Sequence, residues 1–185
     1  LWKNDKQVTL DNANGKQNDY SHDLLTQEAF KFVNNHKDKP FFLYLAYTIP
    51  HVKWQVPDLG QYAEKDWPEK MKIQAAMVTR MDRDIGQLKR LLEKLGISED
   101  TLIMFNSDNG AHGKGGTLDF FKTSGELKGK KRNMYDGGVR SPQIAYWPNK
   151  VPAGTVSDHI SAFWDILPTL SDLTGEPIKG ETDGI

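Results

Sequence analysis

Residues 101–116 read TLIMFNSDNGAHGKGG, a run of apolar and β-branched residues that stops abruptly at an acid and an amide. Thr101 to Phe105 has the composition of a buried strand. A glycine-rich segment with one histidine and one lysine follows Ser107 to Gly110. Asp-Asn-Gly is first of all a turn signal, but no second strand follows at hairpin distance. The alternative is that Asp108 and Asn109 supply hard oxygen ligands for Ca²⁺ or Mg²⁺.

The composition is that of a folded, nearly neutral chain. The 185 residues are 37% hydrophobic, with five Trp and eight Phe, and the formal net charge is −1. These side chains suffice for a core, and no basic face gathers the Lys and Arg, so nucleic acid is not an expected partner. No apolar run approaches the length of a membrane span. Because cysteine is absent, disulfides, zinc-thiolate sites and a thiol nucleophile are excluded within these residues.

Helical and strand-like segments alternate along the chain. Apolar spacing predicts a helix over residues 20–37 with a cap at Ser21 or Asp23, a long helix from Glu69 to Leu95 that ends at Gly96, and a last helix between Asp165 and Gly175. Short apolar runs predict strands at Phe41–Tyr47, buried on both faces, at Thr101–Phe105 and within residues 141–148. This order is typical of an α/β fold in which helices cover a mostly parallel sheet.

Residues capable of chemistry follow two of the predicted strands. His51 follows the first strand, and Asp108 and Asn109 follow the second. Ligands of such sheets bind beyond the carboxyl ends of the strands, so we expect these groups to converge. The long polar loop of residues 110–138 adds His112, Lys114, Lys130, Lys131 and Arg132. Taken singly, each has an ordinary interpretation: a loop histidine, a solvated basic run or a tight turn at YDGGVR.

The joint pattern resembles a known family. The chain contains, in this order, FFLYLAYTIPH, MVTRMDRDIGQLKRLLEKLG, TLIMFNSDNGAH, LKGKKRNMYDGGVRSPQIAYWP and ISAFWDILPTLSDLTG. This series resembles the type I sulfatases, the arylsulfatase-like enzymes of the alkaline-phosphatase superfamily, and in particular members similar to arylsulfatase A and N-acetylgalactosamine-6-sulfatase. The resemblance implies an α/β alkaline-phosphatase-like sandwich, of which residues 1–185 would form the C-terminal part of the large subdomain.

The resemblance also implies roles for individual residues. Asp108 and Asn109 match the DNG motif that binds the active-site calcium. His51 matches the histidine that contacts the sulfate and protonates the leaving oxygen. Lys131 matches the lysine that holds a sulfate oxygen, and His112 is a candidate for substrate contact. The substrate would be a sulfated small molecule or glycan, and the parent protein would be periplasmic, secreted or lysosomal.

Several active-site motifs of the family do not occur in this sequence. In the family, the nucleophile is a formylglycine made from a Cys/Ser-x-Pro-x-Arg signature, which does not occur here, and two further calcium aspartates are also not found. Asp136 stands where the family usually has Glu, a departure that we expect to be structural. We therefore expect an internal fragment that does not turn over a sulfate ester and binds calcium poorly.

Two alternatives remain open at this point. Phosphodiesterases and phosphomutases of the same superfamily use two metals and often carry SDHG, so Asn109 favours the single-calcium sulfatase. A non-catalytic descendant that binds sulfated glycans is the second alternative. We also expect strands without neighbours to expose apolar surface, which favours self-association.

Overall fold

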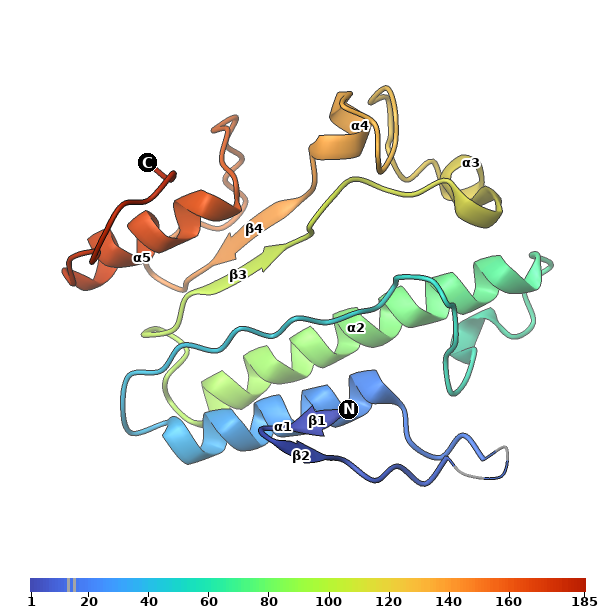
Figure 1. Cartoon of the computed structure of the whole chain (residues 1–185), viewed down its shortest axis with the longest axis horizontal. Helices are drawn as coiled ribbons and strands as arrows, with labels where there is room; N and C mark the ends of the chain where they lie inside the picture. Colours follow the sequence, from blue (N-terminus) through green and yellow to red (C-terminus); the bar gives the residue numbers. More distant parts are fainter. Residues whose placement is uncertain (13, 15) are drawn as a thin grey trace. The chain divides into compact units, whose positions relative to one another are not determined.

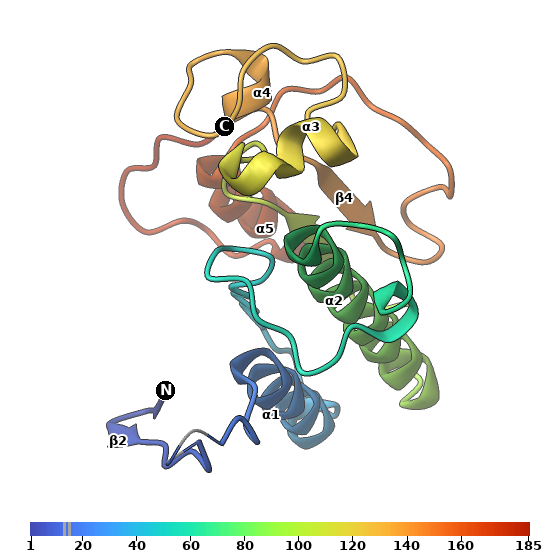
Figure 2. The same ribbon diagram turned by 90° about the vertical axis from the view of Figure 1, so that its right-hand side faces the viewer.

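Two long helices lie side by side in the larger unit of the chain. The computed structural model describes residues 1–12, 14 and 16–185, which divide into two units, Leu1–Val151 and Pro152–Ile185. In the first unit, α1 (Ser21–His36) and α2 (Glu69–Lys94) pack against each other (Figure 1 and Figure 2). Both helices were predicted from their apolar spacing, and this prediction is confirmed.

The buried side chains of α1 explain its position. They recur at i, i+4, i+7 and i+11, which makes one face of the helix: His22, Thr26, Ala29 and Val33. The N-cap position is Tyr20, without a side-chain cap, so the predicted cap at Ser21 or Asp23 is wrong. The helix α2 ends as predicted, because Gly96 adopts φ +72°.

The main strand pair of the first unit is antiparallel, which corrects the expectation of a mostly parallel sheet. The strand β3 (Ile103–Asn106) pairs with β4 (Gln143–Tyr146), and Asn106 lies opposite Gln143. The chain leaves β3 and enters β4 at the same end, so the long connection between them acts as the loop of a hairpin. A second antiparallel pair joins β1 (Trp2–Lys3) to β2 (Lys6–Gln7).

The segment Phe41–Tyr47 is extended but pairs with no strand among the described residues, so the predicted strand is wrong. It is also not buried on both faces, because Phe42 is 69% exposed and Tyr44 is 76% exposed while their neighbours are half-buried. The covered face rests on α1, where the Tyr47 hydroxyl lies 2.7 Å from Thr26 Oγ1. One side of this segment is therefore open to solvent.

Short helical turns complete both units. In the first unit they are η2 (Gly60–Tyr62), η3 (Lys114–Gly116), α3 (Thr117–Phe121) and α4 (Asp136–Val139). Trp67 contacts Phe120 and Phe121 edge-on, which anchors α3 to the segment before α2. The second unit contains η4 (Phe163–Asp165) and α5 (Ile166–Thr174), and α5 ends at Gly175 as predicted. None of the helices among the described residues combines the length and the apolar composition of a membrane span.

Candidate active site

An open cavity of about 390 Å³ lies in the first unit, where the extended segment and β3 both end. His51 and Asp108, which the sequence places after these two segments, both line it. The other walls come from the start of α1, the end of the extended segment and α2, and include Tyr20, Ser21, Tyr47, Thr48, Ile49 and Met77. The volume lies within the range of small-molecule sites.

The side chains of Asp108 and Asn109 have oxygen atoms free for a cation. Among the described residues the Asp108 carboxylate, which is exposed, has no hydrogen bond or ion pair. The Asn109 amide donates from Nδ2 to Gly110 O at 3.1 Å, which leaves its Oδ1 available. A carboxylate and an amide oxygen suit a hard divalent ion, but two ligands are fewer than calcium requires.

Backbone contacts between glycines join the SDNG loop to the YDGG turn. Gly110 N–H donates to Gly138 O at 2.9 Å. A Cβ on Gly110 would lie 2.1 Å from Gly137 O, so no other residue fits this approach. Lys131 N–H also donates to Ala111 O, at 2.7 Å. The backbone of Lys131 is thus fixed beside the loop that carries Asp108.

The electrostatic environment of His112 includes two of the other candidate residues. Its pKa is lowered, chiefly by burial and then by the positive charges of His51 and Lys131, so both residues lie close to it. Lys114 N–H donates to His112 Nδ1 at 3.1 Å, so the neutral ring carries its proton on Nε2. The imidazole also stacks on the Trp54 indole, with ring centroids 5.7 Å apart.

One ring nitrogen of His51 is engaged by the backbone. Its Nδ1 lies 2.5 Å from Val52 O, and because a carbonyl oxygen only accepts, Nδ1 is the donor. Nε2 is then the nitrogen that remains for a ligand. Lys131 does not line the cavity itself. Its ammonium group forms no ion pair with the described residues, so its charge is available to a ligand. The structure therefore gathers all five predicted site residues around the cavity and the adjoining loop.

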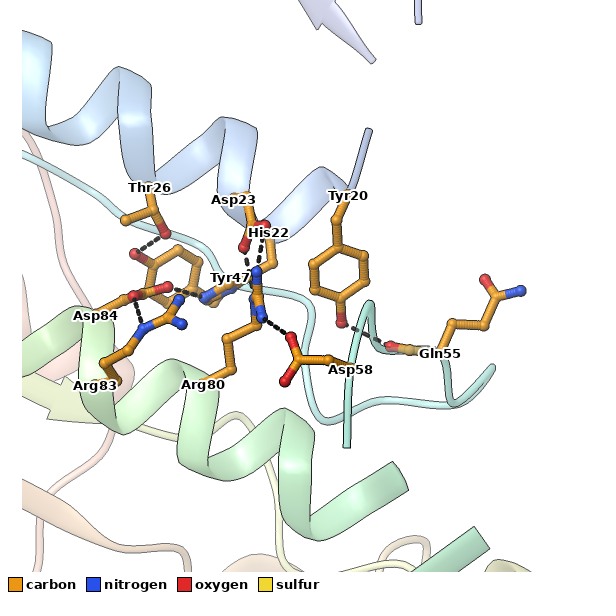
Figure 3. Close-up of polar contacts among 10 residues, drawn as sticks. All are labelled: Tyr20, His22, Asp23, Thr26, Tyr47, Gln55, Asp58, Arg80, Arg83 and Asp84. Carbon is orange, nitrogen blue, oxygen red and sulfur yellow. Dashed lines mark hydrogen bonds and ion pairs between the residues drawn. The ribbon is translucent and has the colours of Figure 1, made fainter. Parts of the chain in front are cut away.

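The sequence analysis missed a polar network that joins α1, α2 and the segment after His51 (Figure 3). On α2, Arg80 donates to both carboxylate oxygens of Asp23 on α1, and to Asp58 at 3.2 Å. Tyr20 OH donates to Gln55 O at 2.8 Å. Asp58 and Gln55 both belong to the segment that follows His51, so the network ties this segment to the two helices.

The most buried part of the network is an imidazole–carboxylate pair. His22 is 1% exposed, and its Nε2 lies 2.9 Å from Asp84 Oδ2. His22, Asp23 and Asp84 are close enough to hold a metal ion, but Arg80 and Arg83 already bind the two carboxylates. We therefore interpret the group as a network in which arginine ion pairs hold the carboxylates and His22 is hydrogen-bonded to Asp84. Its signal in the sequence was a polar residue on each apolar helix face, since Asp84 stands seven residues after the buried Met77.

Comparison with known proteins identifies relatives along nearly the whole chain. A family model described as Sulfatase matches residues 1–176. The human steryl-sulfatase is 34% identical over 88% of this chain, and human arylsulfatase A is 30% identical over 88%. The N-acetylgalactosamine-6-sulfatase of the dog is 33% identical over 80%. These matches cover only 28%, 29% and 28% of the respective relatives, so the chain spans less than a third of their length.

Solved structures agree with these matches. The crystal structure of Ps i-CgsB in complex with k-i-k-neocarrahexaose superposes with a TM-score of 0.78 and 36% identity, over 90% of this chain and 37% of that one. A second structure, whose title concerns the metabolism of multiple glycosaminoglycans by Bacteroides thetaiotaomicron, superposes with a TM-score of 0.69 and 25% identity. This match covers 89% of the present chain and 35% of the other chain.

Proposed function

The chain belongs to the sulfatase family, and we propose that it forms part of a sulfuric ester hydrolase that cleaves sulfate monoesters of glycans. The observation that carries this proposal is the shared cavity of His51 and Asp108, with Lys131 bonded to the adjoining loop. The glycan as substrate class is supported by the related structure of Ps i-CgsB, which was solved in complex with k-i-k-neocarrahexaose.

The residue types suit the demands of the reaction. A sulfate monoester resists attack because its oxygens repel nucleophiles and its alcohol is a poor leaving group. The Lys131 ammonium binds a sulfate oxygen and neutralises its growing charge. His51 acts in its doubly protonated form: Nδ1–H stays bonded to Val52 O, the Nε2 proton passes to the leaving oxygen as the S–O bond breaks, and the ring is left neutral. His112 contacts the substrate beside them.

Asp108 and Asn109 would hold the family's calcium ion through a carboxylate and an amide oxygen. Their unused oxygens fit such an ion, and the remaining ligands would come from outside these 185 residues. A bound calcium ion supplies positive charge to the sulfate. The precursor signature of the formylglycine nucleophile does not occur in the sequence, so we assign the attacking group to no residue here.

Lys131→Ala in the full-length parent protein tests the proposal. Loss of a group that stabilises transition-state charge lowers turnover of a small aryl sulfate by about two to three orders of magnitude. The melting temperature hardly changes, because a loop lysine contributes little packing. Arg132→Ala is the matched control, since it removes a charge from the neighbouring, exposed position. Small and equal effects of both changes on sulfate release would contradict the assigned role.

A further inference from the structure

Positive charge that the proposed chemistry does not use surrounds residues 112–116, which we call the His112 loop. Lys130 lies against Gly113, where a Cβ would be 3.0 Å from the lysine Nζ. Lys114 belongs to the loop itself, and its charge contributes to the lowered pKa of His112. Neither lysine forms a salt bridge with the described residues. The loop therefore presents cations without a partner in the part of the chain that the structure describes.

Two buried nitrogen atoms next to these lysines also lack a partner among the described residues. They are Trp54 Nε1 and His112 Nε2, on the two rings that stack on each other. The indole nitrogen of Trp54 is always an N–H donor. His112 Nε2 is also a donor in the neutral ring, because Nδ1 accepts a hydrogen bond. Burying a donor without an acceptor is unfavourable, so these two N–H groups would gain from an acceptor that the described residues do not supply.

The Trp54–His112 stack packs directly against the backbone of the His112 loop. Gly115 adopts φ +69°, and a Cβ on it would lie 2.9 Å from two carbon atoms of the Trp54 ring. Glycine is thus the residue that lets the indole rest directly on the loop backbone. The two unpartnered donors and the two lysines are therefore parts of one cluster, and an anionic oxygen would satisfy both kinds of group.

We propose that Lys114, Lys130 and the Trp54–His112 pair form a second anion subsite beside the reacting sulfate, which binds an additional sulfate or carboxylate of the same oligosaccharide. The inference rests on the proposed function and narrows its substrate class. The parent enzyme prefers multiply charged glycans over isolated monosulfates, because the second charged group binds where the loop cations lack a partner.

Substrate preference in the full-length parent protein tests this subsite. The preference is the ratio of kcat/KM for a disulfated disaccharide to kcat/KM for its monosulfated counterpart. Lys114→Ala and Lys130→Ala each lower the ratio about tenfold, through KM rather than kcat, as expected of one lost charge-assisted contact. Trp54→Phe keeps the stacked ring but removes the N–H, and it lowers the ratio as well.

Controls separate this subsite from general charge effects and from the proposed function. Arg132→Gln removes a charge from the same connection and leaves the ratio unchanged. A monosulfated disaccharide that also carries a uronic acid tests for a carboxylate subsite. If the ratio of its kcat/KM to that of the plain monosulfated disaccharide falls in the Lys130→Ala variant, the subsite binds a carboxylate. Ratios that stay at the parent value in both lysine variants overturn the subsite. A Lys131→Ala variant with undiminished turnover of a small aryl sulfate would overturn the proposed function alone.

Discussion

Replacing Gly110 by alanine tests whether direct backbone contact holds the SDNG loop against the YDGG turn. The added Cβ would lie 2.1 Å from Gly137 O and 2.8 Å from Gly137 C, whereas real Cβ atoms essentially never come within 3.0 Å of another heavy atom. The two loops must therefore separate by about 1 Å. This movement also stretches the 2.9 Å hydrogen bond from Gly110 N–H to Gly138 O.

The expected loss of stability follows from these two effects. Overpacking of a tight contact costs about 1–3 kcal/mol, and a weakened hydrogen bond adds about 1 kcal/mol. For a chain of this length, 1 kcal/mol lowers the melting temperature by about 2–4 °C, so Gly110→Ala should lower it by roughly 5–15 °C. Circular dichroism during heating and urea titration measures both quantities on the same sample.

Gly86→Ala provides the matched control for this experiment. The position lies within α2, and a Cβ there would have its nearest contact at an ordinary 3.5 Å, with Arg90 Nη1. Because alanine has the higher helix propensity, this change should stabilise the protein by about 0.5–1 kcal/mol. A free energy of unfolding for Gly110→Ala within about 0.5 kcal/mol of the parent chain would refute the reasoning.

Three further predictions concern calcium, pH and association. Asp108→Ala in the full-length protein should abolish the rise of melting temperature on addition of calcium, because an ion that binds only the folded state stabilises it by mass action; a rise that persists would contradict the ligand role. Burial lowers the pKa of His22, so the unfolded chain binds the proton first, and the stability present above about pH 6.5 should decline as the pH falls below it. His22→Gln should flatten this decline in urea titrations between pH 7 and 5, and an unchanged slope would count against it. The exposed Phe42 and Tyr44 side chains should cause the 185-residue chain to self-associate. The double change Phe42→Lys and Tyr44→Lys should reduce this association in sedimentation velocity. A strictly monomeric unsubstituted chain at high concentration would rule out the prediction.

Local patterns in the sequence were sufficient for the three longest helices, α1, α2 and α5, and for the family, whereas the short helices α3 and α4 lie in the segment interpreted as a polar loop. The spacing of apolar residues predicts α1 and α2, and Gly96 and Gly175 mark the ends of two helices because glycine adopts positive φ without steric cost. The order of the motifs indicated the sulfatase family, which the family model and the relatives confirm. The roles of the individual site residues remain predictions.

Only the tertiary structure decided how distant segments meet. The strand β3 pairs antiparallel with β4, and Phe41–Tyr47 lies extended with one open side, although all three segments have similar apolar composition. The physical reason is that a strand's hydrogen bonds go to residues far away in the chain, so its own sequence does not specify its partner or direction. The same holds for the buried His22–Asp84 pair and for the contact between Gly110 and Gly137. In both, each residue depends on a neighbour that the folded backbone brings to it, whereas a helix satisfies its hydrogen bonds within a few residues of its own sequence.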